Sequence, residues 1–119
     1  DHSYVVPQHL CRYLQDKSSD RDLYAGRAMK NPGVIFNSGA AGYLMSRHTI
    51  KRLLDVWNEG KDCQADKSWL RSNPDLVVAQ CLQDVLKVPA LDTREANKYH
   101  RFHSYGLVRT VLAAVDEWY

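Results

Sequence analysis

The chain has 119 residues, of which 45% are hydrophobic and 25% charged, and its formal net charge is +2. This length allows one domain at most, with a composition ordinary for a packed globular protein. Because charges of both signs alternate and no basic cluster stands out, nucleic-acid binding is not expected, and no apolar run approaches the roughly 20 residues of a membrane-spanning helix.

The first part of the chain predicts short elements separated by polar loops. Residues 4–6 favour the end of a strand, and Pro7 suits the first turn of a helix that follows it. Residues 23–26 and 34–36 are strand candidates, and Asn-Pro-Gly at 31–33 is a turn signal between them.

A longer helix is predicted after Ser46, which suits its N-cap, and Gly60 is expected to end it. Its apolar residues fall at i, i+3, i+4 and i+7, namely Ile50, Leu53, Leu54 and Trp57. A further helix is expected to start with Asn73 as the cap, Pro74 at the first helical position and Asp75 in the first turn. The apolar side of this helix is expected to carry Val78, Cys81, Leu82 and Val85.

Short strands that alternate with helices predict an α/β domain with a mostly parallel mixed sheet flanked by helices. Residues 38–42 read Ser-Gly-Ala-Ala-Gly, directly after the strand candidate at 34–36. Small residues bury little and cost backbone entropy, so the backbone here is expected to pass very close to another segment or to a ligand. Since ligands bind at the carboxyl ends of strands in such sheets, this stretch is predicted to be a ligand-facing turn.

Several polar residues could carry chemistry, and each alone has a simpler structural explanation. The pair Asp1 and His2 fits a solvated turn, and Asp75 fits a favourable charge at a helix N-terminus. His103 fits a half-buried histidine bonded to the backbone. None of these residues decides the function by itself.

The three cysteines are an odd number. Either Cys11, Cys63 and Cys81 are all reduced, or one pair is bridged and one cysteine is left over. Cys63 and Cys81 could also be two buried thiols.

The order of several segments is more specific than any single residue. The segments are DHSYVV at 1–6, LYAGR at 23–27, SGAAGYLMS at 38–46, PDLVVAQCL at 74–82, ALDTRE at 90–95 and FH at 102–103. This order resembles glycosyltransferase family 31, the β-1,3-glycosyltransferases that include fringe and the core 1 galactosyltransferase. The first segment resembles the end of the family's Asp-Asp-Asp-Thr-Tyr-Val metal motif, and the third resembles its Ser-Gly-Gly-Ala-Gly-Tyr-Val-Leu-Ser.

The resemblance implies that residues 1–119 are a single partial domain, the C-terminal, acceptor-side part of a GT-A-type nucleotide-sugar transferase fold without its nucleotide-binding half. It implies an inverting, metal-dependent transfer of a hexose, galactose as the best guess, from a UDP-sugar to a hydroxyl of a glycan or glycoprotein. The isolated fragment is expected to be inactive.

Three alternatives stay open. One is a hexosyltransferase of the chondroitin-synthase branch, and another is a non-catalytic lumenal relative that binds carbohydrate or acts as a chaperone. The third is a small α/β interaction domain without sugar chemistry.

The resemblance also implies roles for individual residues. Asp75 would be the general base. Asp1, His2 and His103 would hold a divalent metal, most simply Mn²⁺, although His2 stands where most family members have an aspartate. The implied substrate-binding residues are Ser38, Gly39, Ala40, Ala41, Gly42, Tyr43, Arg27 and Tyr105.

In the family, the cysteines that match Cys63 and Cys81 form a disulfide bond, which implies an oxidising compartment. The resemblance therefore places the parent protein in the Golgi or the endoplasmic reticulum, held by an N-terminal signal anchor that this chain lacks. Cys11 then has no assigned partner.

Overall fold

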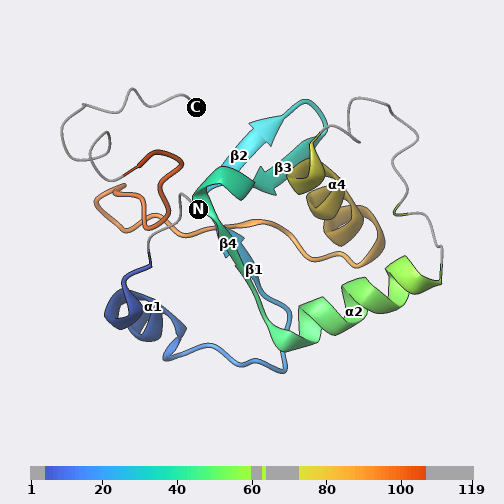
Figure 1. The fold of residues 1–119 in the computed structure, drawn as a ribbon, viewed down its shortest axis with the longest axis horizontal. Helices are drawn as coiled ribbons and strands as arrows, with labels where there is room; N and C mark the ends of the chain where they lie inside the picture. Colours follow the sequence, from blue (N-terminus) through green and yellow to red (C-terminus); the bar gives the residue numbers. More distant parts are fainter. Residues whose placement is uncertain (1–4, 60–62, 64–72, 107–119) are drawn as a thin grey trace.

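The computed structural model describes residues 5–59, 63 and 73–106. In this part of the chain, helices flank two small β-sheets (Figure 1). The helices are α1 (Pro7–Leu14), α2 (Arg47–Asn58) and α4 (Pro74–Gln80), with a short 3₁₀ turn η1 (Gly39–Ala41) and a π-helical run η2 (Cys81–Val85). The strands are β1 (Tyr24–Gly26), β2 (Ala28–Asn31), β3 (Val34–Asn37), β4 (Tyr43–Met45) and β5 (Leu91–Asp92).

The strand pairing is mixed. One sheet has the order β4-β1-β5, in which β1 is antiparallel to β4 and parallel to β5. The other sheet is the antiparallel hairpin β2-β3, in the register Ala28 to Asn37 and Asn31 to Val34. The mixed sheet with helices around it is as predicted, but mostly parallel pairing is wrong for the described strands. Strands joined by a tight turn pair antiparallel, because parallel strands need a long crossover connection.

Local signals located most of the elements. Helix α1 starts at Pro7, and the predicted turn at 31–33 joins β2 to β3 with Gly33 at a φ of 88°. Val5 and Val6 belong to no strand, and residues 1–4 lie outside the described part. Helix α4 starts at Pro74 as predicted, but the Asn73 side chain makes no capping hydrogen bond.

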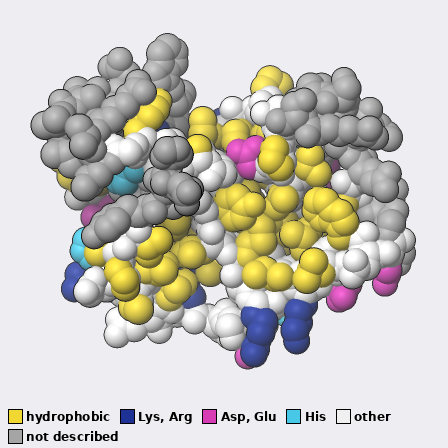
Figure 2. Space-filling model, viewed as in Figure 1, with side chains coloured by type: hydrophobic (Ala, Val, Ile, Leu, Met, Phe, Trp, Pro, Cys, Tyr) yellow, Lys and Arg dark blue, Asp and Glu magenta, His cyan; other side chains and the backbone are white. Residues whose placement is uncertain are grey.

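Helix α2 is capped as predicted, because the Ser46 hydroxyl accepts a hydrogen bond from the Thr49 N–H at 3.1 Å. Its inner side packs through Leu53 and Val56. The other members of the apolar repeat remain exposed: Ile50 by 43%, Leu54 by 54% and Trp57 by 48%. Figure 2 shows an apolar area on the face between α2 and α4. The periodicity thus predicted the helix correctly, although most of its stripe is not covered by the described residues.

The core lies between α4, η2 and the strands. Its buried apolar side chains are Tyr24, Val34, Leu76, Ala79, Leu82, Leu86 and Val88. The run α4-η2 widens at Cys81, where the Leu86 N–H donates to the Cys81 carbonyl at 3.3 Å. Arg52 of α2 pairs with Asp22 and donates to the Leu86 carbonyl at 3.1 Å, so one guanidinium joins three segments.

Helix α1 lies apart from α2 and α4, at the other end of the long axis (Figure 1). None of its residues is buried, and Cys11 is an exposed free thiol. Its Tyr13 ring faces the guanidinium of Arg101 at 5.5 Å, which joins the helix to the loop after β5. None of the helices in the described ranges combines the length and the hydropathy needed to span a bilayer.

Candidate functional site

The small-residue stretch forms the turn between β3 and β4. Residues 39–41 make the 3₁₀ turn η1, and Gly42 follows with φ 75° and ψ 162°, a conformation that is essentially restricted to glycine. A Cβ atom built on Gly42 would meet no described atom within 4 Å, and the three atoms nearest to one on Gly39 would all belong to Asp75, at 3.5 Å or more. Packing among the described residues therefore does not require Gly39 or Gly42 to be small, and the turn has an open side.

Asp75 lies against this turn. The Gly39 N–H donates to Asp75 Oδ2 at 3.0 Å, and the Leu76 N–H donates to Asp75 Oδ1 at 3.1 Å. The first of these hydrogen bonds brings the start of α4 to a segment 36 residues earlier in the chain. The structure thus places the predicted base beside the predicted substrate-binding turn.

The segment around His103 reaches the same turn. The hydroxyl groups of Ser38 and Ser104 are 3.4 Å apart, and the Ser38 N–H donates to the Arg27 carbonyl at 3.0 Å. His103 is exposed and Tyr105 is half-buried. The predicted residues on the β1–β2 junction, the small-residue turn and the loop after β5 therefore lie around one place in the fold.

Thr93 attaches the loop after β5 to the end of β1. Its N–H and its hydroxyl both donate to the Gly26 carbonyl, at 3.2 Å and 2.8 Å. Arg27, the residue that directly follows β1, is buried. The carboxyl ends of the parallel strands β1 and β5 thus meet beside the small-residue turn.

Several charged groups surround this strand end. Burial lowers the pKa of His100, and the positive charges of Arg27 and Arg94 lower it further. Burial by itself raises the pKa of Asp92, but hydrogen bonds and the charge from Arg94 outweigh this, so the pKa lies below its usual value. The Arg94 Nε donates to Asp92 Oδ2 at 2.6 Å. The negative charge of Asp92 acts on His100 in the opposite direction and raises its pKa.

The predicted metal ligands are only partly described. His103 presents an exposed imidazole, whereas Asp1 and His2 lie outside the described residues. Within ranges 5–59, 63 and 73–106, no group of three or more His, Cys, Asp and Glu side chains is placed to hold a metal ion. The described residues thus offer one imidazole of the predicted ligand set.

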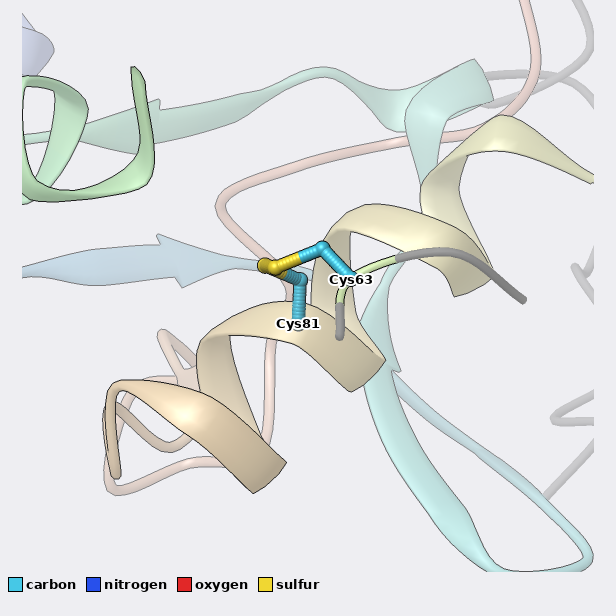
Figure 3. The surroundings of a disulfide bond; sticks show 2 residues. All are labelled: Cys63 and Cys81. Carbon is cyan, nitrogen blue, oxygen red and sulfur yellow. A yellow bond between two sulfur atoms is a disulfide. The ribbon is translucent and has the colours of Figure 1, made fainter. Parts of the chain in front are cut away.

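Cys63 and Cys81 form a disulfide bond, with their Cα atoms 4.8 Å apart (Figure 3). This is the pairing that the family resemblance implied. The bond closes the chain segment in which Asp75 lies, with partners separated by 18 residues. The disulfide bond therefore fixes helix α4, which carries Asp75, at the residue that directly follows it, Cys81.

Sequence reasoning missed two residues that hold the turn in place. Asn37 precedes the small residues and is fully buried, and its N–H donates to the Tyr24 hydroxyl at 3.0 Å. The available signal was a lone amide residue at the end of the apolar run 34–36. Ser104 was also missed, although it follows His103 directly.

A curated galactosyltransferase aligns with most of the chain. It is the glycoprotein-N-acetylgalactosamine 3-beta-galactosyltransferase 1 of Xenopus laevis, 29% identical over 107 residues. The chain is a distant relative of this galactosyltransferase. The alignment covers 88% of the chain and 28% of the relative's own length. It confirms the resemblance to glycosyltransferase family 31.

No protein-family model matches the chain. No solved structure gives a significant match either. The relationship is supported by sequence similarity such as that to the galactosyltransferase.

Proposed function

We propose that this chain is the acceptor-side part of an inverting β-1,3-glycosyltransferase that moves a hexose from a UDP-sugar to a hydroxyl group of a glycan or glycoprotein. Galactose is the proposed donor sugar. It is supported by the activity for which the relative is named and by the likeness of residues 90–95 to the core 1 enzyme.

One observation supports this proposal above the others: the hydrogen bond from the Gly39 N–H to Asp75 Oδ2. It holds a carboxylate at the edge of an open turn of small residues, where a sugar ring can approach the backbone. The carboxylate is half-buried, so an acceptor could reach it while much of the surrounding water is displaced.

The residues have complementary roles in the transfer. Asp75 takes the proton of the acceptor hydroxyl, and the acceptor oxygen forms a bond to the anomeric carbon of the hexose. The bond from that carbon to the UDP oxygen breaks, and UDP leaves with the electron pair. Each oxygen of Asp75 accepts one backbone N–H. Since an ionised carboxylate has about four acceptor sites, capacity remains for the acceptor hydroxyl.

A divalent cation would neutralise negative charge on the leaving diphosphate. His103 would supply one of its ligands, and Asp1 and His2 would supply others. Arg27 and Tyr105, together with the turn residues Ser38 to Tyr43, would contact the substrates. The disulfide bond is compatible with the oxidising lumen of the Golgi or the endoplasmic reticulum. We place the full-length protein there, held in the membrane by an N-terminal signal anchor.

The experiment compares the full-length protein with its Asp75→Asn variant in transfer from UDP-galactose to an N-acetylgalactosamine glycopeptide. The asparagine keeps an oxygen for the Gly39 N–H and removes the base. We expect kcat to fall by about 10²- to 10⁴-fold, the usual contribution of a general base. The unfolding temperature should fall only slightly, because the neutral amide loses the favourable charge at the start of α4.

Asp84→Asn is the matched control, because Asp84 is an exposed carboxylate on the helical run that continues α4. Its kcat should equal that of the unmodified protein. Chelation with EDTA should abolish transfer, and added Mn²⁺ should restore it. Full activity of the Asp75→Asn variant would reject Asp75 as the general base. Absence of transfer with Mn²⁺ and every UDP-hexose tried would reject the proposed glycosyltransferase function.

A further inference from the structure

A buried pair of residues lies under the small-residue turn. Asn37 is the last residue of β3 and has 0% exposure, and Tyr24 of β1 is equally deep at 1%. The Asn37 N–H donates to the Tyr24 hydroxyl at 3.0 Å, and the Asn37 Nδ2 donates to the Tyr24 carbonyl at 3.2 Å. Since β1 and β3 belong to different sheets, this pair joins the two sheets directly beneath the turn.

The backbone from Asn37 to Gly39 is fixed at three consecutive positions. The Asn37 N–H goes to the Tyr24 hydroxyl, the Ser38 N–H to the Arg27 carbonyl at 3.0 Å, and the Gly39 N–H to Asp75 Oδ2 at 3.0 Å. A peptide unit that rotates at the first position changes the direction of the next two N–H groups. One of the two backbone hydrogen bonds to the Asp75 carboxylate therefore depends on where Asn37 is held.

The Asn37 side chain carries a polar atom that lowers the stability of the fold. Its Oδ1 atom is buried and accepts no hydrogen bond from the described residues. A buried acceptor without a donor costs free energy, which an apolar side chain of the same size would avoid. Alanine is smaller, so it would leave a cavity and would also lose the Nδ2 hydrogen bond to the Tyr24 carbonyl. Residues that keep such a penalty are concentrated where geometry serves a function.

We propose that Asn37, held by the Tyr24 hydroxyl, is a positioning residue that directs the Gly39 N–H and, through it, the carboxylate of Asp75 toward the acceptor. This inference rests on the proposed function, because the carboxylate acts as the base only there. Asn37 touches no reacting atom, and it acts through the backbone of the turn. Small displacements of a reacting group lower rates strongly, by up to about 100-fold for 1 Å.

The test uses Tyr24→Phe, which removes the hydroxyl that accepts the Asn37 N–H, and Asn37→Ala, which removes the amide. The matched control is Thr49→Val. Thr49 is also fully buried, and its hydroxyl accepts the Leu23 N–H at 2.9 Å in the first turn of α2, outside the turn at 38–42. All three variants lose a buried hydrogen-bonding group, so all three are expected to unfold at a lower temperature.

Two measurements in the full-length protein separate positioning from stability. The first is the division of the effect between kcat and the KM for UDP-galactose. We expect kcat to fall about 10- to 100-fold in Tyr24→Phe and Asn37→Ala at unchanged KM, and to be unchanged in Thr49→Val. The second is amide hydrogen exchange at Gly39, which should accelerate at least tenfold in the first two variants only.

Equal kcat in all variants would overturn the proposal, and so would losses of kcat that follow unfolding temperature in the control as well. If the unmodified protein transfers no sugar, the proposed function fails. The hydrogen-exchange rate at Gly39 then decides whether Asn37 and Tyr24 position the turn. Faster exchange at Gly39 in Tyr24→Phe but not in Thr49→Val would then support the positioning role. An unchanged rate would reject it.

Discussion

Gly26 and the side chain of Asn37 lie so close together that a methyl group on Gly26 would require its neighbours to shift by a few tenths of an ångström. A Cβ atom on Gly26 would be 3.1 Å from Asn37 Cβ and 3.1 Å from Tyr43 Cβ. Gly26→Ala should therefore lower the free energy of unfolding by about 1–3 kcal/mol, as overpacking of a core does. Urea denaturation of the full-length protein measures this change.

Gly39→Ala is the control for that experiment, since the nearest atoms to its added methyl group would be 3.5 Å away, an ordinary contact distance. Its unfolding free energy should stay within about 0.5 kcal/mol of the unmodified protein, as for most substitutions outside the core. Equal urea midpoints for Gly26→Ala and Gly39→Ala would contradict the close approach.

Gly42 requires glycine for a different reason. Space is available at this position, but φ 75° with ψ 162° is a conformation that side chains disfavour. Gly42→Ala should cost about 1–3 kcal/mol of stability through backbone strain. Asparagine, which tolerates ordinary left-handed turns, should not restore the loss. Thermal unfolding of both variants tests this, and a fully stable Gly42→Asn would show that the turn adopts another conformation.

The sequence predicted elements whose signals are local. Ser46 identified the start of α2, Pro74 that of α4, and the Asn-Pro-Gly turn the hairpin β2-β3. Each depends on a few neighbouring residues and their backbone preferences. Elements of this kind need no knowledge of distant parts of the chain.

The pairing of strands could not be read in the same way. Strand β5 has two residues, too few for any alternation, and its parallel partner β1 lies more than 60 positions away. The exposure of Leu54 and Trp57 could not be predicted either, because periodicity defines the apolar face of a helix but does not show which residues cover that face.

At the site, sequence patterns identified Asp75 and the small residues but not the contact between them. The hydrogen bond from Gly39 depends on how α4 packs against β3. The burial of Asn37 has the same origin, since the sequence around a strand end does not show whether a distant segment covers it. Residue types could be predicted, and their distances could not.

Loss of the disulfide bond should destabilise the protein. In the chain-entropy model a bridge between residues 18 positions apart contributes about 3 kcal/mol by restricting the unfolded chain. Cys63→Ser should lose this amount, and reduction of the unmodified protein should give the same loss. Cys11→Ser, at the exposed free thiol, is the control and should unfold as before. Unchanged stability after reduction would mean that the bond is absent in solution.

His100 should make the stability depend on pH. Burial and the nearby guanidinium groups of Arg27 and Arg94 lower its pKa in the folded protein. The unfolded chain then binds the proton more tightly than the folded one. Stability should therefore fall as the pH decreases below about 6.5, the ordinary histidine pKa, and continue to fall until the folded pKa is passed.

The measurement is urea unfolding of His100→Gln between pH 7.5 and pH 5, which should decline less than the unmodified protein over that range. Lys98→Gln, at an exposed residue of the same loop, is the control. Identical pH profiles for His100→Gln and the unmodified protein would rule out this contribution of the histidine.

The position of Arg52 has a consequence for how the domain opens. Its guanidinium pairs with Asp22 ahead of β1 and donates to the Leu86 carbonyl at the end of the π-helical run. Helix α2 and the π-helical run η2 cannot separate while these hydrogen bonds persist. Fluctuations of the two segments should thus be concerted, as in a single cooperative unit, rather than proceeding as independent fraying of each helix.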